Sequence, residues 1–250
     1  MPVLDEFTLE GQVIVVCISN TSDIIYLSEY LLFAGAEVIF WAGTSDLLTE
    51  VEKRFGTAIN GRVVDLQSRE EILESKNHAL SRYGQIHGLV VDSRNVLAKP
   101  MSEVSDDDWN LVMDSNAKSS FLLYQAFGEC MKESGYGRIV NITSELADRS
   151  VDNFSVFSAS QAAIHSLTKS MTLEYSKYSV RINTIATGWT IPVQTDLAEQ
   201  QKELLVRFIP LRRKGVPSDL GPLLVFLCSE SCDYTTGQPI FINGGLTARP

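Results

Sequence analysis

Hydrophobic and polar positions alternate between two kinds of stretch along this chain. Short runs rich in β-branched residues predict buried strands, and longer stretches with apolar residues three or four positions apart predict helices. The predicted strands are Val13–Ser19, Glu37–Trp41, Arg62–Asp65, His87–Val91, Arg138–Ile142, Arg181–Ile185 and Pro239–Ile242. The predicted helices are Ile24–Ala34, Asp46–Phe55, Glu70–Tyr83, Asp106–Glu133 and Val156–Tyr178.

This alternation predicts an α/β fold: a Rossmann-like, doubly wound parallel sheet with helices on both faces, in a single domain over residues 1–250. The strands are apolar on both sides, as a sheet covered on both faces requires. In such a sheet, ligands bind beyond the carboxyl ends of the strands. We therefore expect functional residues in the loops that follow the strands.

Composition and charge argue against several classes of binding partner. With a formal net charge of −10, the chain repels phosphate backbones and anionic lipids, so we expect neither nucleic acid nor a membrane as partner. The four cysteines form no CxxC pair and have no histidine beside them, so we expect no metal site. Few, unpatterned thiols and a first segment without the features of a signal peptide favour a cytoplasmic location.

The C-terminal half contains several motifs at characteristic spacing. Residues 137–144 are GRIVNITS, residues 157–163 are FSASQAA, and residues 181–188 are RINTIATG. In this order they resemble the short-chain dehydrogenase/reductase family, which has a serine-bearing strand end, then YxASKAA, then RVNxVxPG. The resemblance extends from Gly11 to the C-terminus and implies the family's fold. It implies less about activity, because a fold does not fix a function.

The resemblance also locates the segment that would bind NAD(P), a TGxxxGxG turn after the first strand. Its three glycine positions are occupied here by Ile18, Ser22 and Ile24. β-Branched side chains are poorly suited to positive φ and add bulk where the diphosphate lies. Asp23 adds a negative charge near the helix N-terminus that would otherwise bind the diphosphate. We therefore expect this chain to bind no dinucleotide.

Two other cofactor segments differ from the family pattern. Trp41-Ala42-Gly43, after the second strand, supplies neither a carboxylate for a ribose nor a guanidinium for a 2′-phosphate. The family's NNAG is replaced by Val91-Asp92-Ser93-Arg94, while Asp65 remains at the position of the adenine-side aspartate. These changes strengthen the same expectation.

Active family members transfer a proton with a Ser–Tyr–Lys set supported by an asparagine. Asn116 and Ser144 are present, but Phe157 replaces the tyrosine and Gln161 replaces the lysine. A phenyl ring cannot transfer a proton, a contribution typically worth roughly 10²–10⁴ in rate. Asn116 and Ser144 can persist as partners of the backbone. We expect all four positions to be vestigial and the chain to catalyse no dehydrogenation alone.

The leading hypothesis is a non-catalytic subunit of a hetero-oligomeric dehydrogenase. The resemblance implies a heterotetramer in which an intact paralogue holds NAD(P) and oxidises an alcohol, as in family heteromers that act on acyl-CoA thioesters, including one of the benzylsuccinate branch of aromatic degradation. The two long helices that build the family's main dimer are kept. Their candidate anchors, for an interface or for the core, are Phe121, Leu122, Tyr124, Phe127, Leu167 and Met171. Residues 212–214, Arg-Arg-Lys, are candidate contacts for CoA phosphates.

Two alternatives stay open. One is a cofactor-free lyase or dehalogenase on the same fold, and the other is a regulator that binds a ligand without chemistry. Separately, Glu145 and Asp148, just after Ser144, are candidate substitutes for the missing proton-transfer group. Charged residues in such loops are usually solvated, so we expect both side chains to face water.

Overall fold

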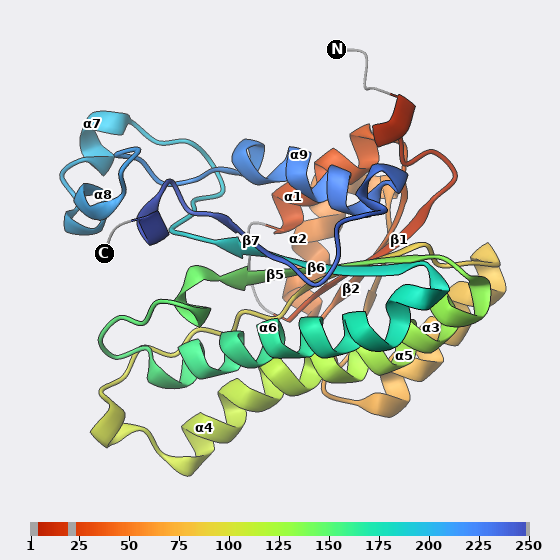
Figure 1. Cartoon of the computed structure of the whole chain (residues 1–250), viewed down its shortest axis with the longest axis horizontal. Coiled ribbons are helices and arrows are strands. Elements are labelled where there is room, and N and C mark those ends of the chain that lie inside the picture. The colour runs from red at the N-terminus through yellow and green to blue at the C-terminus, as the bar shows by residue number, and fades with distance from the viewer. Residues whose placement is uncertain (1–4, 20–23, 249–250) are drawn as a thin grey trace.

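The structure is a computed structural model that describes residues 5–19 and 24–248; Ser22 and Asp23 lie outside these ranges. Within them, seven parallel strands form one sheet in the order β3-β2-β1-β4-β5-β6-β7 (Figure 1). The strands are β1 (Val13–Ile18), β2 (Glu37–Ala42), β3 (Asn60–Val63), β4 (Gly88–Asp92), β5 (Gly137–Ser144), β6 (Val180–Thr187) and β7 (Pro239–Ile242).

Helices connect the strands and cover both faces of the sheet. They are α1 (Ile24–Phe33), α2 (Ser45–Phe55), α3 (Arg69–Tyr83), α4 (Asp106–Met113), α5 (Ser119–Ser134), α6 (Ser155–Tyr175), α7 (Leu197–Gln200), α8 (Leu204–Phe208) and α9 (Pro217–Cys228). Helices α1, α2 and α9 cover one face, and α3, α5 and α6 cover the other (Figure 1). The predicted doubly wound α/β fold is confirmed.

Strand β1 forms because its side chains are apolar at every position. In β1, Ile14, Val16 and Ile18 contribute to the core beneath α1 and α9, while Val13, Val15 and Cys17 contribute to the core beneath α3 and α5. Successive side chains of a strand point to opposite faces, so only a continuous apolar run can serve both cores. All six residues of β1 are buried.

Two predicted elements differ in the structure, and helices α7, α8 and α9 are not among the predicted ones. The third strand runs from Asn60 to Val63 rather than from Arg62 to Asp65, because it pairs along β2 from Ile39 to Ala42. As an edge strand it is half exposed, so it lacks the apolar run that marks the central strands. The predicted long helix Asp106–Glu133 is interrupted by a π-helical turn at Asp114–Lys118, which separates α4 from α5.

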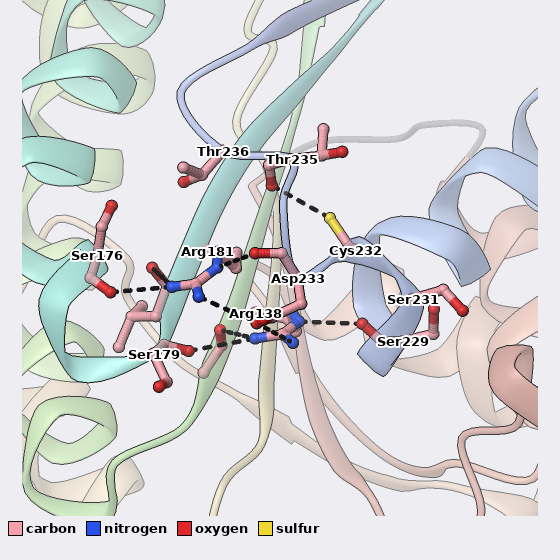
Figure 2. Close-up of polar contacts among 12 residues, drawn as sticks. Arg138, Ser176, Ser179, Arg181, Ser229, Ser231, Cys232, Asp233, Thr235 and Thr236 are labelled. Atoms are coloured by element: carbon pink, nitrogen blue, oxygen red, sulfur yellow. Dashed lines mark hydrogen bonds and ion pairs between the residues drawn. The ribbon is translucent and has the colours of Figure 1, made fainter.

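At the amino ends of β5 and β6, two arginines fasten strand starts to neighbouring loops (Figure 2). Arg138 is 2% exposed, and its guanidinium donates to the carbonyl oxygens of Gly137, Ser179 and Ser229 at 3.0–3.2 Å. Arg181 donates to the carbonyl oxygen of Asp233 at 2.6 Å, and its Nη2 lies 3.0 Å from the Asp233 carboxylate. This network ties β5 and β6 to the segment after α9.

Two features are absent from the described ranges, a membrane-spanning helix and a metal-binding cluster. None of the helices there combines the length and apolarity needed to cross a membrane. The same residues contain no group of three or more His, Cys, Asp or Glu side chains arranged to hold a metal ion.

Candidate functional site

The site lies at the carboxyl edge of the sheet, where the strand order reverses between β1 and β4. Ligands of open α/β sheets bind at this kind of switch point. Beside it, the ends of β4, β5 and β6 border a cavity of about 250 Å³. Its lining residues are Arg94, Val96, Ser144, Leu146, Phe154, Phe157, Thr187, Gly188, Trp189 and Thr190.

An ion pair spans part of this edge. The carboxylate of Asp92, the last residue of β4, accepts from Nε of Arg94 at 2.9 Å and from Nη2 at 2.7 Å. Asp92 is 1% exposed and lies beside Ile18 in the register of the sheet. Nη1 of Arg94 donates to Oγ1 of Thr187 at 2.9 Å. The guanidinium therefore links the end of β4 to the end of β6, with β5 between them.

The two replaced proton-transfer positions lie one helical turn apart on α6 but face different surroundings. Phe157 lines the cavity, and its ring lies edge-on to that of Phe154 at 6.3 Å. Gln161 is fully buried, and its Oε1 accepts from the backbone N–H of Ser144 at 3.1 Å. The Gln161 amide is therefore engaged by the end of β5 and does not line the cavity.

Asn116 sits in the π turn with its side chain fully occupied. Its Nδ2 donates to Oγ of Ser160 at 2.9 Å and to the carbonyl oxygen of Asn95 at 3.0 Å, and its Oδ1 accepts from the N–H of Asn95 at 2.8 Å. Its own carbonyl oxygen accepts from the hydroxyls of Ser93 and Ser120. These bonds agree with the interpretation of Asn116 as a group that holds the backbone.

Ser144 has a similar local bond, since its Oγ accepts from the N–H of Leu146 at 3.2 Å. Unlike Asn116, it also lines the cavity. A hydroxyl at this place can donate to a ligand, but Phe157 beside it supplies no group that transfers a proton.

The described residues of the first cofactor segment are packed into the interior. Ile18 and Ile24, at two of the glycine positions, are 0% exposed, whereas Ser22 lies outside the described residues. Trp41 is also fully buried. Asp65 is exposed, and its Oδ1 accepts from the N–H of Gln67 at 2.9 Å. The turn that would approach a diphosphate, residues 20–23, lies outside the described ranges, so the absence of a bound dinucleotide stays a prediction.

The two acids after Ser144 have different surroundings, and the prediction that both face water is wrong for Glu145. Glu145 is 3% exposed, and its Oε2 accepts from Nδ2 of Asn243 at 2.8 Å. Burial raises the pKa of Glu145, an effect that the Asn243 hydrogen bond partly offsets. Asp148 is half exposed and lies 3.3 Å from Nδ1 of His165. Neither acid lines the cavity, so neither is placed to act there.

The basic segment 212–214 is largely neutralised by the chain itself. Arg213 forms a two-pronged ion pair with Asp219 at 2.6 and 2.8 Å, and Lys214 lies 2.7 Å from Glu203. Arg212 donates to the carbonyl oxygen of Arg207. Contact with CoA phosphates stays a prediction.

Most of the candidate interface anchors belong to the core. Leu122, Tyr124, Phe127 and Met171 are buried, and Leu167 packs against the core beneath α5 and α6. Phe121 is the exposed member of the set, at 38%. Other large exposed apolar residues of these segments are Met101 before α4, Trp109 and Leu111 on α4, and Leu173 on α6.

Sequence reasoning noticed Arg94 but missed its partner. Thr187 stands where the family motif has proline, and it is 93 residues away in the chain. Proline has no hydroxyl, so the substitution itself was the one available signal that a polar contact had been added at this edge.

The chain is similar in sequence to one protein family and to several known proteins. Residues 27–247 match the family described as "Enoyl-(Acyl carrier protein) reductase". The 2-dehydro-3-deoxy-D-gluconate 5-dehydrogenase of Bacillus subtilis is 30% identical over 98% of each chain. The "(2S)-[(R)-hydroxy(phenyl)methyl]succinyl-CoA dehydrogenase subunit BbsC" of Thauera aromatica is 31% identical over 87% of this chain and 84% of that protein.

The chain is also similar in fold to a solved structure of a related enzyme. The gluconate 5-dehydrogenase of Burkholderia cenocepacia, in complex with NADP and tartrate, has a TM-score of 0.85 and 26% sequence identity over 98% of this chain and 99% of that chain. That protein binds NADP on a fold that this chain shares.

Proposed function

The chain belongs to the short-chain dehydrogenase/reductase family, and from this membership we propose that it is a non-catalytic subunit of an NAD(P)-dependent alcohol dehydrogenase. It assembles with an intact paralogue, as a heterotetramer, and the paralogue binds the cofactor and transfers the proton. The substrate class that we propose is an alcohol carried on an acyl thioester, such as a hydroxyacyl-CoA.

The observation that carries the proposal is the side chain of Phe157 in the cavity. The residue lies on α6 beside Ser144, where the family's tyrosine stands, and it is 3% exposed. It keeps the volume of the tyrosine ring but has no hydroxyl. The general acid–base step that tyrosine performs therefore has no group to perform it at this position.

The Asp92–Arg94 pair supports the absence of a bound dinucleotide. It occupies the edge of the sheet at which this fold binds ligands. Separating a buried ion pair typically costs about 3–5 kcal/mol, because one charge is left without a partner. Since Asp92 is buried, a ligand that displaces Arg94 incurs a cost of this kind.

The Thauera relative supports the assembly and the substrate class. Its name describes it as a subunit of a dehydrogenase that acts on a CoA thioester. A subunit can contribute contacts and stability to a complex without a complete site of its own.

The test begins with the chain purified alone. We expect no co-purified nicotinamide cofactor, no binding of NAD(H) or NADP(H) by calorimetry, and no oxidation of alcohols. Co-expression with an intact paralogue from the same genome is expected to give a hetero-oligomer that is active. Dinucleotide binding by the isolated chain, or a homotetramer that ignores every intact paralogue, would refute the proposal.

A matched pair of variants locates the chemistry within the complex. Replacing the tyrosine of the partner's YxASK motif with phenylalanine should lower kcat by roughly 10²–10⁴. Ser144→Ala in this chain should leave kcat within about twofold, because a hydroxyl outside the reacting site makes no transition-state contact. A large loss from Ser144→Ala would show that this chain takes part in the reaction.

A further inference from the structure

A second cavity lies at helix α8, which sits beyond the carboxyl edge of the sheet (Figure 1). Its volume is about 290 Å³, and it shares no lining residue with the cavity at Phe157. Its lining residues are Gln201, Val206, Arg207 and Arg212. Because two of these four residues are arginines, the chemistry of the cavity depends on what balances their charges.

The other charged side chains of this part of the chain largely neutralise one another. Residues 196–219 contain five cations and four carboxylates. Three of the carboxylates form ion pairs, which are Lys202–Glu199, Arg213–Asp219 and Lys214–Glu203. The fourth, Asp196, accepts from the backbone N–H of Glu199 at 3.0 Å. This segment therefore keeps a net positive charge in a chain whose formal net charge is −10.

The two arginines that line the cavity are the remaining cations, and both are exposed. Within the described ranges, Arg207 and Arg212 take part in no ion pair. Nε of Arg207 donates to the carbonyl oxygen of Gln201 at 3.5 Å, and Nη1 of Arg212 donates to the carbonyl oxygen of Arg207. A guanidinium carries five N–H donors, so each of the two keeps donors that a ligand in the cavity can reach.

The backbone of Arg212 gives an independent indication. Its φ is 56°, in the left-handed region that favours glycine. Residues in such conformations persist where the surrounding structure compensates for the strain, and they cluster at sites that bind ligands. A glycine would adopt this conformation at a lower cost, so the presence of an arginine points to a use for its side chain.

Two guanidiniums at one cavity favour a phosphate monoester as the ligand. Arginine binds phosphate through pairs of parallel N–H···O bonds. A phosphomonoester carries a charge of about −1.5 to −2 at pH 7, so one such group balances both arginines. On the same helix, Leu204, Leu205 and Phe208 are 67%, 47% and 50% exposed. A flat group attached to the phosphate, such as a nucleobase, can therefore pack on apolar side chains next to the cavity.

We propose that this cavity binds the 3′-phosphate of coenzyme A, with Arg207 and Arg212 donating to its oxygens and the adenine packed on the apolar residues of α8. The inference rests on the proposed function for the choice of ligand, because coenzyme A carries the thioester named there. The non-catalytic chain then holds the coenzyme A end of a substrate that the paralogue oxidises.

Calorimetry on the full-length chain, without paralogue or nicotinamide cofactor, tests the phosphate contact directly. Coenzyme A and dephospho-coenzyme A differ only in the 3′-phosphate, so they form a matched pair of ligands. We expect coenzyme A to bind about tenfold more tightly than dephospho-coenzyme A, since its phosphate gains charge-assisted hydrogen bonds from exposed arginines. Sodium chloride should reduce this difference, because salt screens exposed charges.

Variants then show whether the two arginines cause the difference. Arg207→Gln is expected to weaken the binding of coenzyme A about fivefold and to leave that of dephospho-coenzyme A nearly unchanged. Arg212→Gly should have the same effect, and glycine suits the positive φ, so loss of folding is not expected to mask it. Arg82→Gln, at an exposed arginine of α3, is the matched control and should leave both Kd values unchanged.

Any of three results would overturn the proposal. These are no binding of coenzyme A at millimolar concentration, equal Kd values for coenzyme A and dephospho-coenzyme A, and equal losses of binding in Arg82→Gln and Arg207→Gln. Failure of the proposed function is a separate outcome, because it appears as dinucleotide binding by the isolated chain or as a failure to assemble with a paralogue.

Discussion

The two edges of the sheet both depend on an arginine, but the partners of the two arginines differ. At the amino edge, Arg138 donates to three backbone carbonyls from three segments (Figure 2). At the carboxyl edge, Arg94 bonds to the side chains of Asp92 and Thr187. Backbone carbonyls are present whatever the sequence, whereas side-chain partners can be gained or lost by single substitutions. The first kind of contact maintains a fold, and the second can change while the fold stays.

The largest loss of stability is expected at Arg138. Arg138→Met keeps the aliphatic stem but leaves three carbonyl oxygens without their donor. Unsatisfied buried groups cost about 1–3 kcal/mol each, so we expect the free energy of unfolding to fall by about 5 kcal/mol in urea denaturation. Arg181→Met is the control at the same edge and should cost about 2 kcal/mol, because its guanidinium lies nearer solvent. Equal losses of unfolding free energy in Arg138→Met and Arg181→Met would show that burial of the carbonyl oxygens does not determine the cost.

At the carboxyl edge, Arg94 and Asp92 should behave as a pair whose charges can be removed together at a lower cost than the charge of Arg94 alone. Arg94→Met leaves Asp92 buried and unpaired and should cost about 3 kcal/mol. The double variant Arg94→Met with Asp92→Asn removes both charges and should be more stable than Arg94→Met alone by about 1–2 kcal/mol. A double-mutant cycle in urea measures the coupling. Additive losses would show that the two side chains act separately.

A second pair of variants compares a buried position of α6, Gln161, with a position that lines the cavity, Phe157. Gln161→Lys places an ammonium in a fully buried site and deprives the Ser144 N–H of its acceptor, so stability should fall by about 1–3 kcal/mol. Phe157→Tyr adds a hydroxyl beside an open cavity and should cost less than about 1 kcal/mol. Thermal and urea unfolding compare the two. If Gln161→Lys left the stability unchanged, the side chain at this position would have to reach the cavity at Phe157 rather than stay buried.

The smallest effect concerns pH and a histidine between the two edges. Burial lowers the pKa of His165 below its usual 6.5, and Asp148 partly offsets this. A depressed folded pKa means that the contribution of His165 to stability is present above about pH 6.5 and is lost as pH falls through the folded pKa. The variant His165→Asn should therefore flatten the acid side of a plot of Tm against pH, and Asp148→Asn should steepen it. Changes of the same sign in both variants would contradict this assignment.

The sequence predicted the sheet and most helices because the apolar runs and helical spacings are local signals. Six of the seven strands overlap their predicted ranges almost fully, whereas β3 is shifted, because an edge strand covered on fewer sides needs no continuous apolar run. The π turn at Asp114–Lys118 shifts the phase of the helical spacing without interrupting it, so the sequence predicted one continuous helix. Helices α7 and α8, of four and five residues, are too short to show a period.

The site was predictable only in part, for a different physical reason. Identity alone indicated that Phe157 cannot transfer a proton and that Ser144 and Asn116 would bond to the backbone. Burial of Glu145 depends on Asn243, which is 98 residues away, and the Arg94 contact depends on Thr187. Long-range pairs of this kind leave no periodic signal in a single sequence.

The π turn has one more consequence, for how the chain presents itself to other molecules. An α-helix advances about 100° per residue, so one residue more in a turn rotates everything before it by about that angle. Helix α5 directs Leu122, Tyr124 and Phe127 inward, whereas α4, before the turn, exposes Trp109 and Leu111. Deleting a single residue from 114–118 would change this phase, turning the outward-facing aromatic surface of α4 while the hydrophobic contacts of α5 kept their direction.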